Sequence, residues 1–291
     1  MRTMTDNLGE MAGEIQNLLQ NLLLNHSSVY MWNTPDSSVK VLSLVGDYAY
    51  KQLEEEGRQI QAHVLEQYRR FYALLTVLLK DQPKDTLKEL SEENTVMMCT
   101  IEQNHTWCKN TQEVFHEAVQ ALQRELKLLN RLYDSSDGEA IYVPDTNALL
   151  YNPDLESWMF PETPRFAIVL LPTVLSELDL LKVNHRNEEV RKKAEKLTRK
   201  VKEYRRRGSL ISGVTLVKGR STIQAIAIEP NVKSSLPWLD SDNDDDRILA
   251  GVIEVMRARP RSPVLTVSRD INFQNKTEFA NIPFIEPPEP A

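Results

Sequence analysis

The stretch Val143-Pro-Asp-Thr-Asn-Ala-Leu-Leu150 decides how the C-terminal half of the chain is interpreted. Ile141 and Tyr142 precede it, so a short run of β-forming residues leads into a polar tripeptide and then into an apolar pattern. This order predicts a buried strand, a turn and the start of a helix. Sites in parallel α/β sheets form at the carboxyl ends of strands, so Asp145 lies where chemistry is expected. Asp, Thr and Asn are also common helix N-caps, and for this tripeptide alone capping is the simpler interpretation.

The rest of residues 140–291 alternates between strand and helix patterns. This alternation predicts an α/β fold, a parallel sheet covered by helices on both faces. Residues 222–228 read as an extra strand or an extended arm. The other strands are expected at 141–143, 166–171, 213–217, 264–267 and 283–285, and the helices at 172–182, 187–206, 246–258 and directly after Asp270.

The N-terminal half, residues 1–133, is predicted to be an all-α domain. One long helix is expected from Asp36 or Ser37 to about residue 80, and a second from about residue 85 to about residue 133, forming a long antiparallel hairpin. We find no catalytic motif in this half. Its long apolar stripes predict packing with the first helical segment or with a second copy of the chain, so we expect a homo-oligomer or a dock for a protein regulator. Residues 134–139 are polar and turn-rich and are expected to be a linker.

Composition and charge indicate whether the protein binds nucleic acid, enters a membrane or is secreted. The net charge of −7 argues against non-specific binding to nucleic acid, but residues 182–207 contain twelve Lys and Arg against four Glu. This basic helix, with Arg205, Arg206 and Arg207 at its end, is either a phosphate-backbone face or a solvated charged helix. The chain has no run of eighteen apolar residues and no secretory signal pattern, and its two cysteines are unsuited to a disulfide. We therefore expect a cytoplasmic protein that does not enter a membrane.

Acidic residues recur beside the predicted strands. Asp145 follows the first strand, and Glu177 lies in the helix after the second. Asp246 opens the helix that precedes the strand at 264–267, and Asp270 follows that strand. These side chains should converge on one edge of the sheet. Because such a carboxylate cluster is unfavourable without cations, and because carboxylate and water ligands suit Mg²⁺ or Mn²⁺, the pattern predicts a metal site. Helix capping is the structural alternative, and it is compatible with metal binding.

Four segments in this order resemble the PIN domain of the FEN/PIN-like metal-dependent nucleases. They are Val143-Pro-Asp-Thr-Asn147, Pro172-Thr-Val-Leu-Ser-Glu-Leu-Asp179, Asn243-Asp-Asp-Asp-Arg-Ile-Leu-Ala250 and Leu265-Thr-Val-Ser-Arg-Asp-Ile-Asn272, within residues 141 to about 285. The resemblance implies that Asp145, Glu177, Asp246 and Asp270 form the catalytic acidic quartet, with Asp245 as an alternative or additional ligand and Asn147 and Ser268 in support.

The resemblance also implies an activity. It implies hydrolysis of phosphodiester bonds in single-stranded RNA with one or two divalent ions. The family commonly has Thr-x-Asp before the last acid, whereas this chain has Ser268-Arg-Asp270, so Arg269 would either hold phosphate or weaken metal binding. Two alternatives remain: an inactive PIN-like interaction module and a structure-specific DNA nuclease. The residues alone do not distinguish RNA from DNA.

Overall fold

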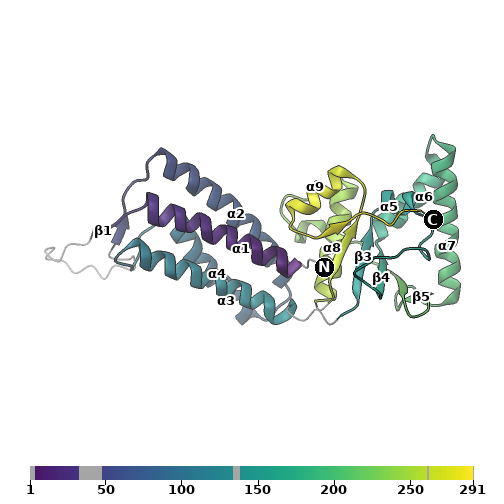
Figure 1. The fold of residues 1–291 in the computed structure, drawn as a ribbon, viewed down its shortest axis with the longest axis horizontal. Helices are drawn as coiled ribbons and strands as arrows, with labels where there is room; N and C mark the ends of the chain where they lie inside the picture. Colours follow the sequence, from purple (N-terminus) through teal and green to yellow (C-terminus); the bar gives the residue numbers. More distant parts are fainter. Residues whose placement is uncertain (1–3, 33–47, 134–137, 261, 291) are drawn as a thin grey trace. The chain divides into compact units, whose positions relative to one another are not determined.

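The computed structural model describes residues 4–32, 48–133, 138–260 and 262–290. It divides into two compact units (Figure 1). Residues 8–131 form one, here called the helical unit, and residues 1–7 with 132–291 form the other, here called the sheet unit. Most of the expected linker, residues 134–137, lies outside the described residues.

The sheet unit contains a six-stranded sheet of order β5-β6-β4-β3-β7-β8. Its neighbouring strands are parallel except for β5 and β6, which pair antiparallel. Every residue of β3 and β4 is buried, as expected for central strands covered on both faces. The strands are β3 (Ala140–Pro144), β4 (Phe166–Leu170), β5 (Val214–Val217), β6 (Ser221–Ala225), β7 (Val264–Val267) and β8 (Phe284–Ile285). The predicted α/β class is confirmed.

Residues 222–228 contain a strand, so the alternative of an extended arm was wrong. The strand is β6, and it lies inside the sheet, where it pairs with β4 on one side and β5 on the other. A tight hairpin connects β5 to β6, and in it Gly219 has a φ of +76° that favours glycine. The hairpin makes β5 the antiparallel edge strand of an otherwise parallel sheet.

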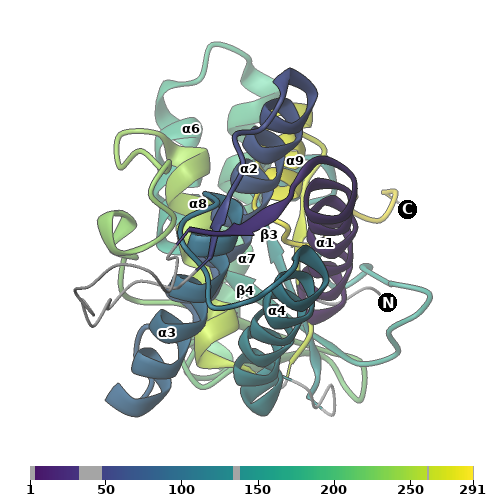
Figure 2. The same ribbon diagram turned by 90° about the vertical axis from the view of Figure 1, so that its left-hand side faces the viewer.

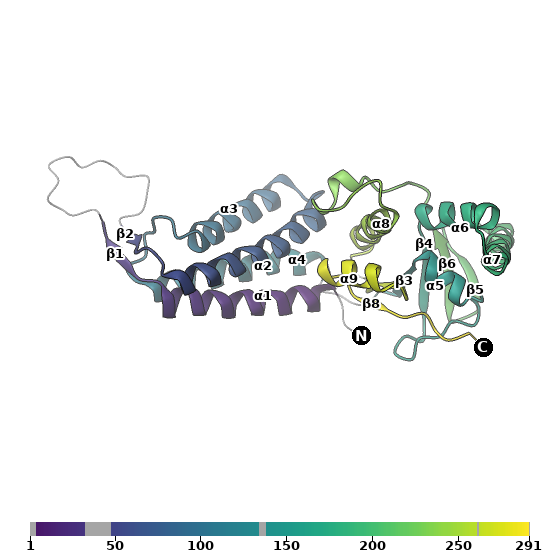
Figure 3. The ribbon, with the colours of Figure 1, turned by 90° about the horizontal axis from the view of Figure 1, so that it is seen from above.

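Helices cover both faces of this sheet (Figures 1 and 3). One layer consists of α5 (Thr146–Tyr151), α6 (Pro172–Asn184) and α7 (Glu188–Arg207), and the other of α8 (Asp244–Ala258) and α9 (Ile271–Phe279). The chain moves outward from β3 through β4 to β6, then crosses back to β7 and β8 on the opposite side of β3. The order therefore reverses between β3 and β7. In such sheets, ligands bind in the crevice beyond the carboxyl ends of the two strands at this switch point.

The described part of the helical unit contains four long helices, α1 (Met4–Gln20), α2 (Glu55–Leu79), α3 (Lys84–Ile101) and α4 (Thr111–Tyr133). Figure 2 shows them from the end that carries β1 (Val29–Met31). The apolar face of α1 is buried, with Leu8, Ile15 and Leu19 fully inaccessible. The expectation that the first helical segment would pack with the others is therefore met within the chain. None of the described helices combines the length and apolarity needed to span a membrane.

Both long helices predicted for this half were too long. The first begins at Glu55, because residues 48–50 form β2 (Tyr48–Tyr50) and pair with β1; the expected cap at Asp36 or Ser37 lies outside the described residues. The second is divided into α3 and α4 around residues 102–110. Gln103 adopts a φ of 56°, which ends α3, and Thr106 forms a β-bridge with Tyr48. The antiparallel hairpin is therefore formed by α2 and α3, with α4 as a separate helix.

Candidate active site

Asp145 lies between β3 and α5, at the switch point of the sheet. Its backbone N–H donates to the carbonyl of Val267 on β7 at 3.0 Å. Its carboxylate caps α5, because Oδ1 accepts a 2.6 Å hydrogen bond from the Ala148 N–H, and Oδ2 accepts one from the Ser268 hydroxyl. Only 4% of Asp145 is exposed. The expected capping role is present, and the same carboxylate is held at the carboxyl end of the strand.

The surroundings of Asp145 raise the pKa of its carboxyl group. Burial raises the pKa of its carboxyl to about 6, against the lowering effect of the hydrogen bonds from Ser268 and Ala148. The negative charges of Asp270 and Glu177 raise this pKa further. Two other predicted acids therefore act on Asp145 through their charges, and a bound cation would relieve this repulsion.

Asp270 follows β7 on the other side of the switch point. It caps α9, with Oδ1 accepting from the N–H of Asn272 at 2.8 Å, and its Oδ2 accepts from Asn147 Nδ2 at 3.2 Å. The Asp270 N–H donates to the Ser268 hydroxyl oxygen at 2.9 Å. Ser268 thus connects both acids directly, and Asn147 joins the turn after β3 to Asp270. These are the two residues for which the resemblance implied a supporting role.

Glu177 reaches the same edge from α6. Its Oε2 accepts a hydrogen bond from the hydroxyl of Thr146, the residue after Asp145. Burial raises the pKa of Glu177; the hydrogen bond lowers it, and the charges of Asp244 and Asp245 raise it. The charge of Arg247 lowers this pKa, but the net shift is upward, mainly because of burial.

Asp246 is paired differently from the other three acids. It is 6% exposed, and its Oδ1 accepts a 2.7 Å hydrogen bond from the ammonium of Lys276 on α9. The same ammonium lies 3.4 Å from Asp245 Oδ2. Burial lowers the pKa of Lys276, but hydrogen bonds and charges from Asp246 and Asp245 outweigh it and raise the pKa overall. Lys276 therefore remains a cation beside both candidate acids of α8.

The arginines predicted to bind nucleic acid occupy different surroundings. Arg269 places its guanidinium 3.9 Å from the centre of the Tyr151 ring and 3.8 Å from Glu286, so Tyr151 and Glu286 are its contacts. Arg207 pairs with Glu156 at 3.0 Å and lies over Tyr204. Arg205 and Arg206 are exposed on α7. Of the three arginines at the end of this helix, these two keep the features expected of a phosphate contact.

The acids fit a divalent cation in their chemistry but do not form a coordination shell. Carboxylate oxygens are the donors that Mg²⁺ and Mn²⁺ prefer. Within the ranges that the structure describes, no group of three or more His, Cys, Asp or Glu residues is arranged to hold a metal ion. The cause is visible at Asp145, Asp246 and Asp270, whose oxygens are directed at protein hydrogen-bond donors. To bind a metal ion, these carboxylates would have to give up some of their hydrogen bonds and direct the freed oxygens at the ion.

Two contacts of this site were missed from the sequence. Thr146 lies inside the stretch that was singled out, but it was considered only as a possible helix cap; its hydroxyl instead donates to Glu177. Lys276 lies 30 residues from Asp246 and carries no motif. The only sequence signal for Lys276 is that it is the single lysine of α9, a short helix that begins at a predicted acid. This signal is too weak to have identified Lys276 in advance.

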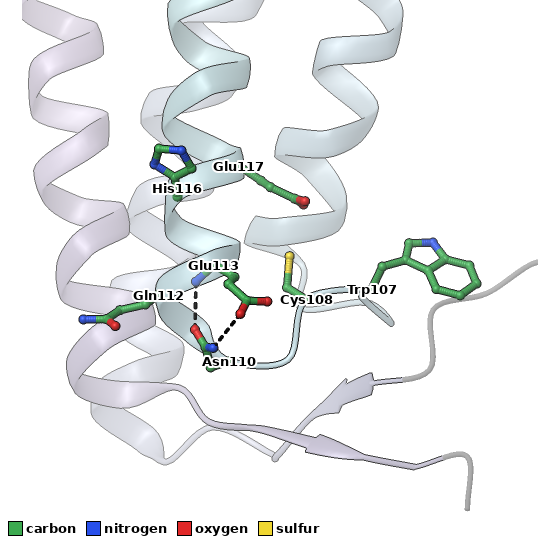
Figure 4. A pocket seen from close by; sticks show the side chains of 7 residues that line it. All are labelled: Trp107, Cys108, Asn110, Gln112, Glu113, His116 and Glu117. Carbon is green, nitrogen blue, oxygen red and sulfur yellow. Dashed lines mark hydrogen bonds between the residues drawn. The ribbon is translucent and has the colours of Figure 1, made fainter. Parts of the chain in front are cut away.

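A shallow hollow in the helical unit is the alternative candidate for an active site. It has a volume of about 470 Å³ and lies beside the start of α4, where Trp107, Cys108 and His116 contribute to its lining (Figure 4). Asn110 and Glu113 cap each other there, with both hydrogen bonds at 2.9 Å. Burial raises the pKa of the Cys108 thiol to about 11, so it is not a nucleophile at neutral pH. The hollow therefore offers no reactive group comparable to the acids of the sheet unit.

Comparison with known proteins agrees with the geometry of the sheet unit. The sequence model of the PIN domain family matches residues 142–286, which include all four predicted acids. No curated protein matches the chain. The matched region starts within β3 and ends just after β8, so it includes part of β3 and all of the other five strands of the sheet. The C-terminal half of this chain is a PIN domain.

Proposed function

We propose that the PIN domain is a divalent-metal-dependent endoribonuclease that hydrolyses phosphodiester bonds of single-stranded RNA. PIN domains are generally nucleases. The observation that carries the proposal is the position of Asp145 and Asp270 on either side of the sheet's switch point, joined by Ser268 and with Glu177 acting on Asp145 through its charge. Clefts at this point of a parallel sheet are where ligands bind.

The chain's own residues divide the work of the proposed reaction. Asp145, Asp270, Glu177 and either Asp245 or Asp246 would hold Mg²⁺ or Mn²⁺. When bound, such an ion polarises the phosphate and lowers the pKa of the attacking water. Ser268 donates a hydrogen bond to Asp145 and Asn147 donates one to Asp270, so both acids are held in place. Thr146 orients Glu177 in the same way. Burial of Asp145 strengthens its interaction with any cation by excluding water.

The basic face of α7 supports an extended anionic substrate. Seven of its cations are exposed, and two of these, Lys192 and Arg207, pair with acids. The other five are Lys196, Arg199, Lys202, Arg205 and Arg206. By contrast, Lys200 pairs with Asp154 at 2.7 Å and Arg207 with Glu156 at 3.0 Å. Exposed cations spaced along one helix suit successive phosphates of a single strand. This charge pattern fits RNA and DNA equally, so the nucleic acid must be identified by experiment.

One observation favours an inactive interaction module as the second candidate. Among the described residues the acids are not assembled into a metal-binding group, and Lys276 already neutralises part of their charge. In that case the carboxylates would serve as helix caps and ion-pair partners only. The two candidates differ in one measurable respect, which is cleavage that depends on both a divalent ion and Asp145.

The test is cleavage of end-labelled single-stranded RNA and DNA of the same sequence, with and without Mn²⁺. Asp145→Asn keeps the side-chain volume but removes a negative ligand, and cleavage should fall by at least about 100-fold, the usual effect of losing an electrostatic group at a reacting centre. The matched control is Asp179→Asn, because Asp179 lies on α6 but pairs with Lys182 outside the site. Equal cleavage by the parent and the Asp145 variant would exclude the metal-site mechanism. Cleavage of DNA but not of RNA would show that the substrate is single-stranded DNA and not RNA.

A further inference from the structure

Lys276 is a fixed cation built into one side of the acidic cluster. Its Nζ lies 2.7 Å from Asp246 Oδ1, 3.1 Å from Asn243 Oδ1 and 3.4 Å from Asp245 Oδ2. The other oxygen of Asp246 accepts the N–H of Asp240 at 2.9 Å. Both oxygens of Asp246 therefore have protein partners, and one of these partners is positively charged.

On the other side of the cluster, the described residues provide no such cation. In the described part of the chain, Asp145, Glu177 and Asp270 form no ion pair with a basic side chain; their oxygens accept from hydroxyl, amide and backbone N–H groups. The charge of Arg247 lowers the pKa of Glu177, but its guanidinium pairs with Asp244 at 2.9 Å and Glu229 at 3.0 Å. Uncompensated negative charge is thus concentrated at the switch point between β3 and β7.

This asymmetry determines where a divalent ion can be held. An ion between Asp145 and Asp270 gains the attraction of carboxylates that have no other cation. An ion at Asp245 and Asp246 must displace the Lys276 ammonium or remain beside it, and repulsion between neighbouring cations is strong where water is partly excluded. The side chain of Lys276 is 27% exposed and that of Asp246 8%, so solvent weakens this repulsion only in part.

We propose that the site takes a single divalent ion on the side of Asp145 and Asp270, and that Lys276 supplies the positive charge that a second ion would provide on the side of α8. The inference rests on the proposed metal-dependent function. It assigns Lys276 as a positioning residue that offsets part of the negative charge of Asp245 and Asp246. A purely structural clamp between α8 and α9 would make the same contacts but would not limit the number of ions.

The experiment counts bound ions in the full chain. The protein is stripped with a chelator and titrated with Mn²⁺, with bound ions measured by calorimetry and free Mn²⁺ by electron paramagnetic resonance. We expect one tightly bound ion in the parent and two in Lys276→Met, because that variant leaves Asp245 and Asp246 without a cation. Lys276→Arg keeps the charge and should stay at one.

Lys200→Met is the matched control. Lys200 also lies 2.7 Å from a carboxylate, that of Asp154, and its side chain is 21% exposed. It lies on α7, and neither of its acidic partners, Asp154 and Glu156, is a proposed metal ligand. This variant should bind one ion, as the parent does. A thermal melt of each variant checks that it is folded.

The outcomes separate the two proposals. Two equally tight ions in the parent overturn the role of Lys276, and this result does not depend on whether the variant folds. One ion in a folded Lys276→Met variant also overturns it, while leaving the metal-dependent function intact. A parent that binds no Mn²⁺ overturns both. Two ions in Lys276→Met, returning to one when Asp246 is also changed to Asn, would support the inference.

Discussion

The hydroxyl of Ser268 donates a hydrogen bond to Asp145 Oδ2 although the two residues lie 123 positions apart in the chain. The same hydroxyl oxygen accepts the backbone N–H of Asp270 at 2.9 Å. Ser268 is fully buried, so these partners satisfy both its donor and its acceptor capacity away from water. One side chain at the end of β7 therefore sets the relative position of two acids from different strand ends.

Replacing Ser268 by Ala should weaken metal binding. The variant removes the hydrogen bond that stabilises the Asp145 carboxylate, so the pKa of Asp145 should rise further above 6. Ser268→Thr retains the hydroxyl and serves as the control. We expect Mn²⁺ affinity at pH 7 to fall about 10-fold in the Ala variant, within the range known for outer-shell partners of metal ligands, and to be kept by Thr. Equal affinities in all three proteins would show that the hydrogen bond is incidental.

Asp145→Asn should stabilise the metal-free protein near neutral pH. The folded-state pKa of Asp145 is raised to about 6 from an ordinary value of 3.8. The folded protein therefore holds this proton more tightly than the unfolded chain, and the resulting stability is complete below about pH 4 and lost as pH rises through 6. Each unit of pKa shift corresponds to about 1.4 kcal/mol. In chelator, the melting temperature of the Asp145→Asn variant should exceed that of the parent at pH 7 but not at pH 4.

The parent and the Asp145→Asn variant should differ in how strongly added metal stabilises them. Added Mn²⁺ should raise the melting temperature of the parent much more than that of Asp145→Asn, because a ligand stabilises only in proportion to its binding of the folded state. The readout is a set of melting curves at increasing Mn²⁺ concentration. An identical shift in both proteins would mean that Asp145 is only a helix cap.

Glu125→Gln should flatten the pH dependence of stability in the helical unit. Glu125 is fully buried, and its Oε1 accepts the Tyr68 hydroxyl at 2.8 Å. Burial raises its pKa to about 8, the Tyr68 hydrogen bond lowers it, and the charge of Glu93 raises it. Stability from this group is thus present in full below about pH 4.5 and lost as pH rises through 8, with a slope of about 1.4 kcal/mol per pH unit for one proton.

Urea unfolding between pH 6 and 8 measures this slope. The free energy of unfolding of the parent should fall more steeply with pH than that of Glu125→Gln. Glu117→Gln changes an exposed glutamate of the same helix and should leave the slope unchanged. Parallel lines for the parent and Glu125→Gln would show that the carboxyl is already ionised at pH 6.

Changing Arg205 and Arg206 together to Ala should weaken binding to single-stranded RNA. If both contact phosphates, the slope of log affinity against log salt should fall by about 0.7 for each lost contact. Arg207→Ala is the comparison, because Arg207 is engaged with Glu156 and lies over Tyr204. Its effect on the slope should be smaller. Binding measured by fluorescence anisotropy at several salt concentrations distinguishes a phosphate-binding face from a solvated helix, for which no slope would change.

The full chain should self-associate through the helical unit, as its apolar stripes suggested. Because α1 buries its own apolar face, the large apolar side chains left exposed near β1 and before α4 become the expected contact: Tyr30, Met31 and Trp107, at 45%, 50% and 61% exposure. Trp107→Ala should lower the mean mass measured by light scattering at increasing concentration. Trp238→Ala, in the sheet unit, should not. A parent that is monomeric at every concentration contradicts the prediction.

The sequence by itself determined the elements of the PIN domain and the acids at their ends. Strand runs such as 166–171, helix caps such as Asp270 and the stop at Gly208 are local signals, because backbone propensity and capping depend on a few neighbouring residues. The order of strands and helices then placed Asp145 and Asp270 at one sheet edge, since parallel strands share their carboxyl ends. Both β3 and β7 were found where the apolar runs indicated.

The tertiary structure decided the partners of these residues. Lys276 meets Asp246 because α9 and α8 lie in the same layer, and Gln103 ends α3 where Thr106 pairs with Tyr48, a residue 58 positions earlier by the numbering. β6 is an interior strand because it pairs with β4 on one side and with β5 on the other. Periodicity encodes which face of an element is buried and not what it is buried against. Contacts between distant segments therefore emerge only when the whole core has formed.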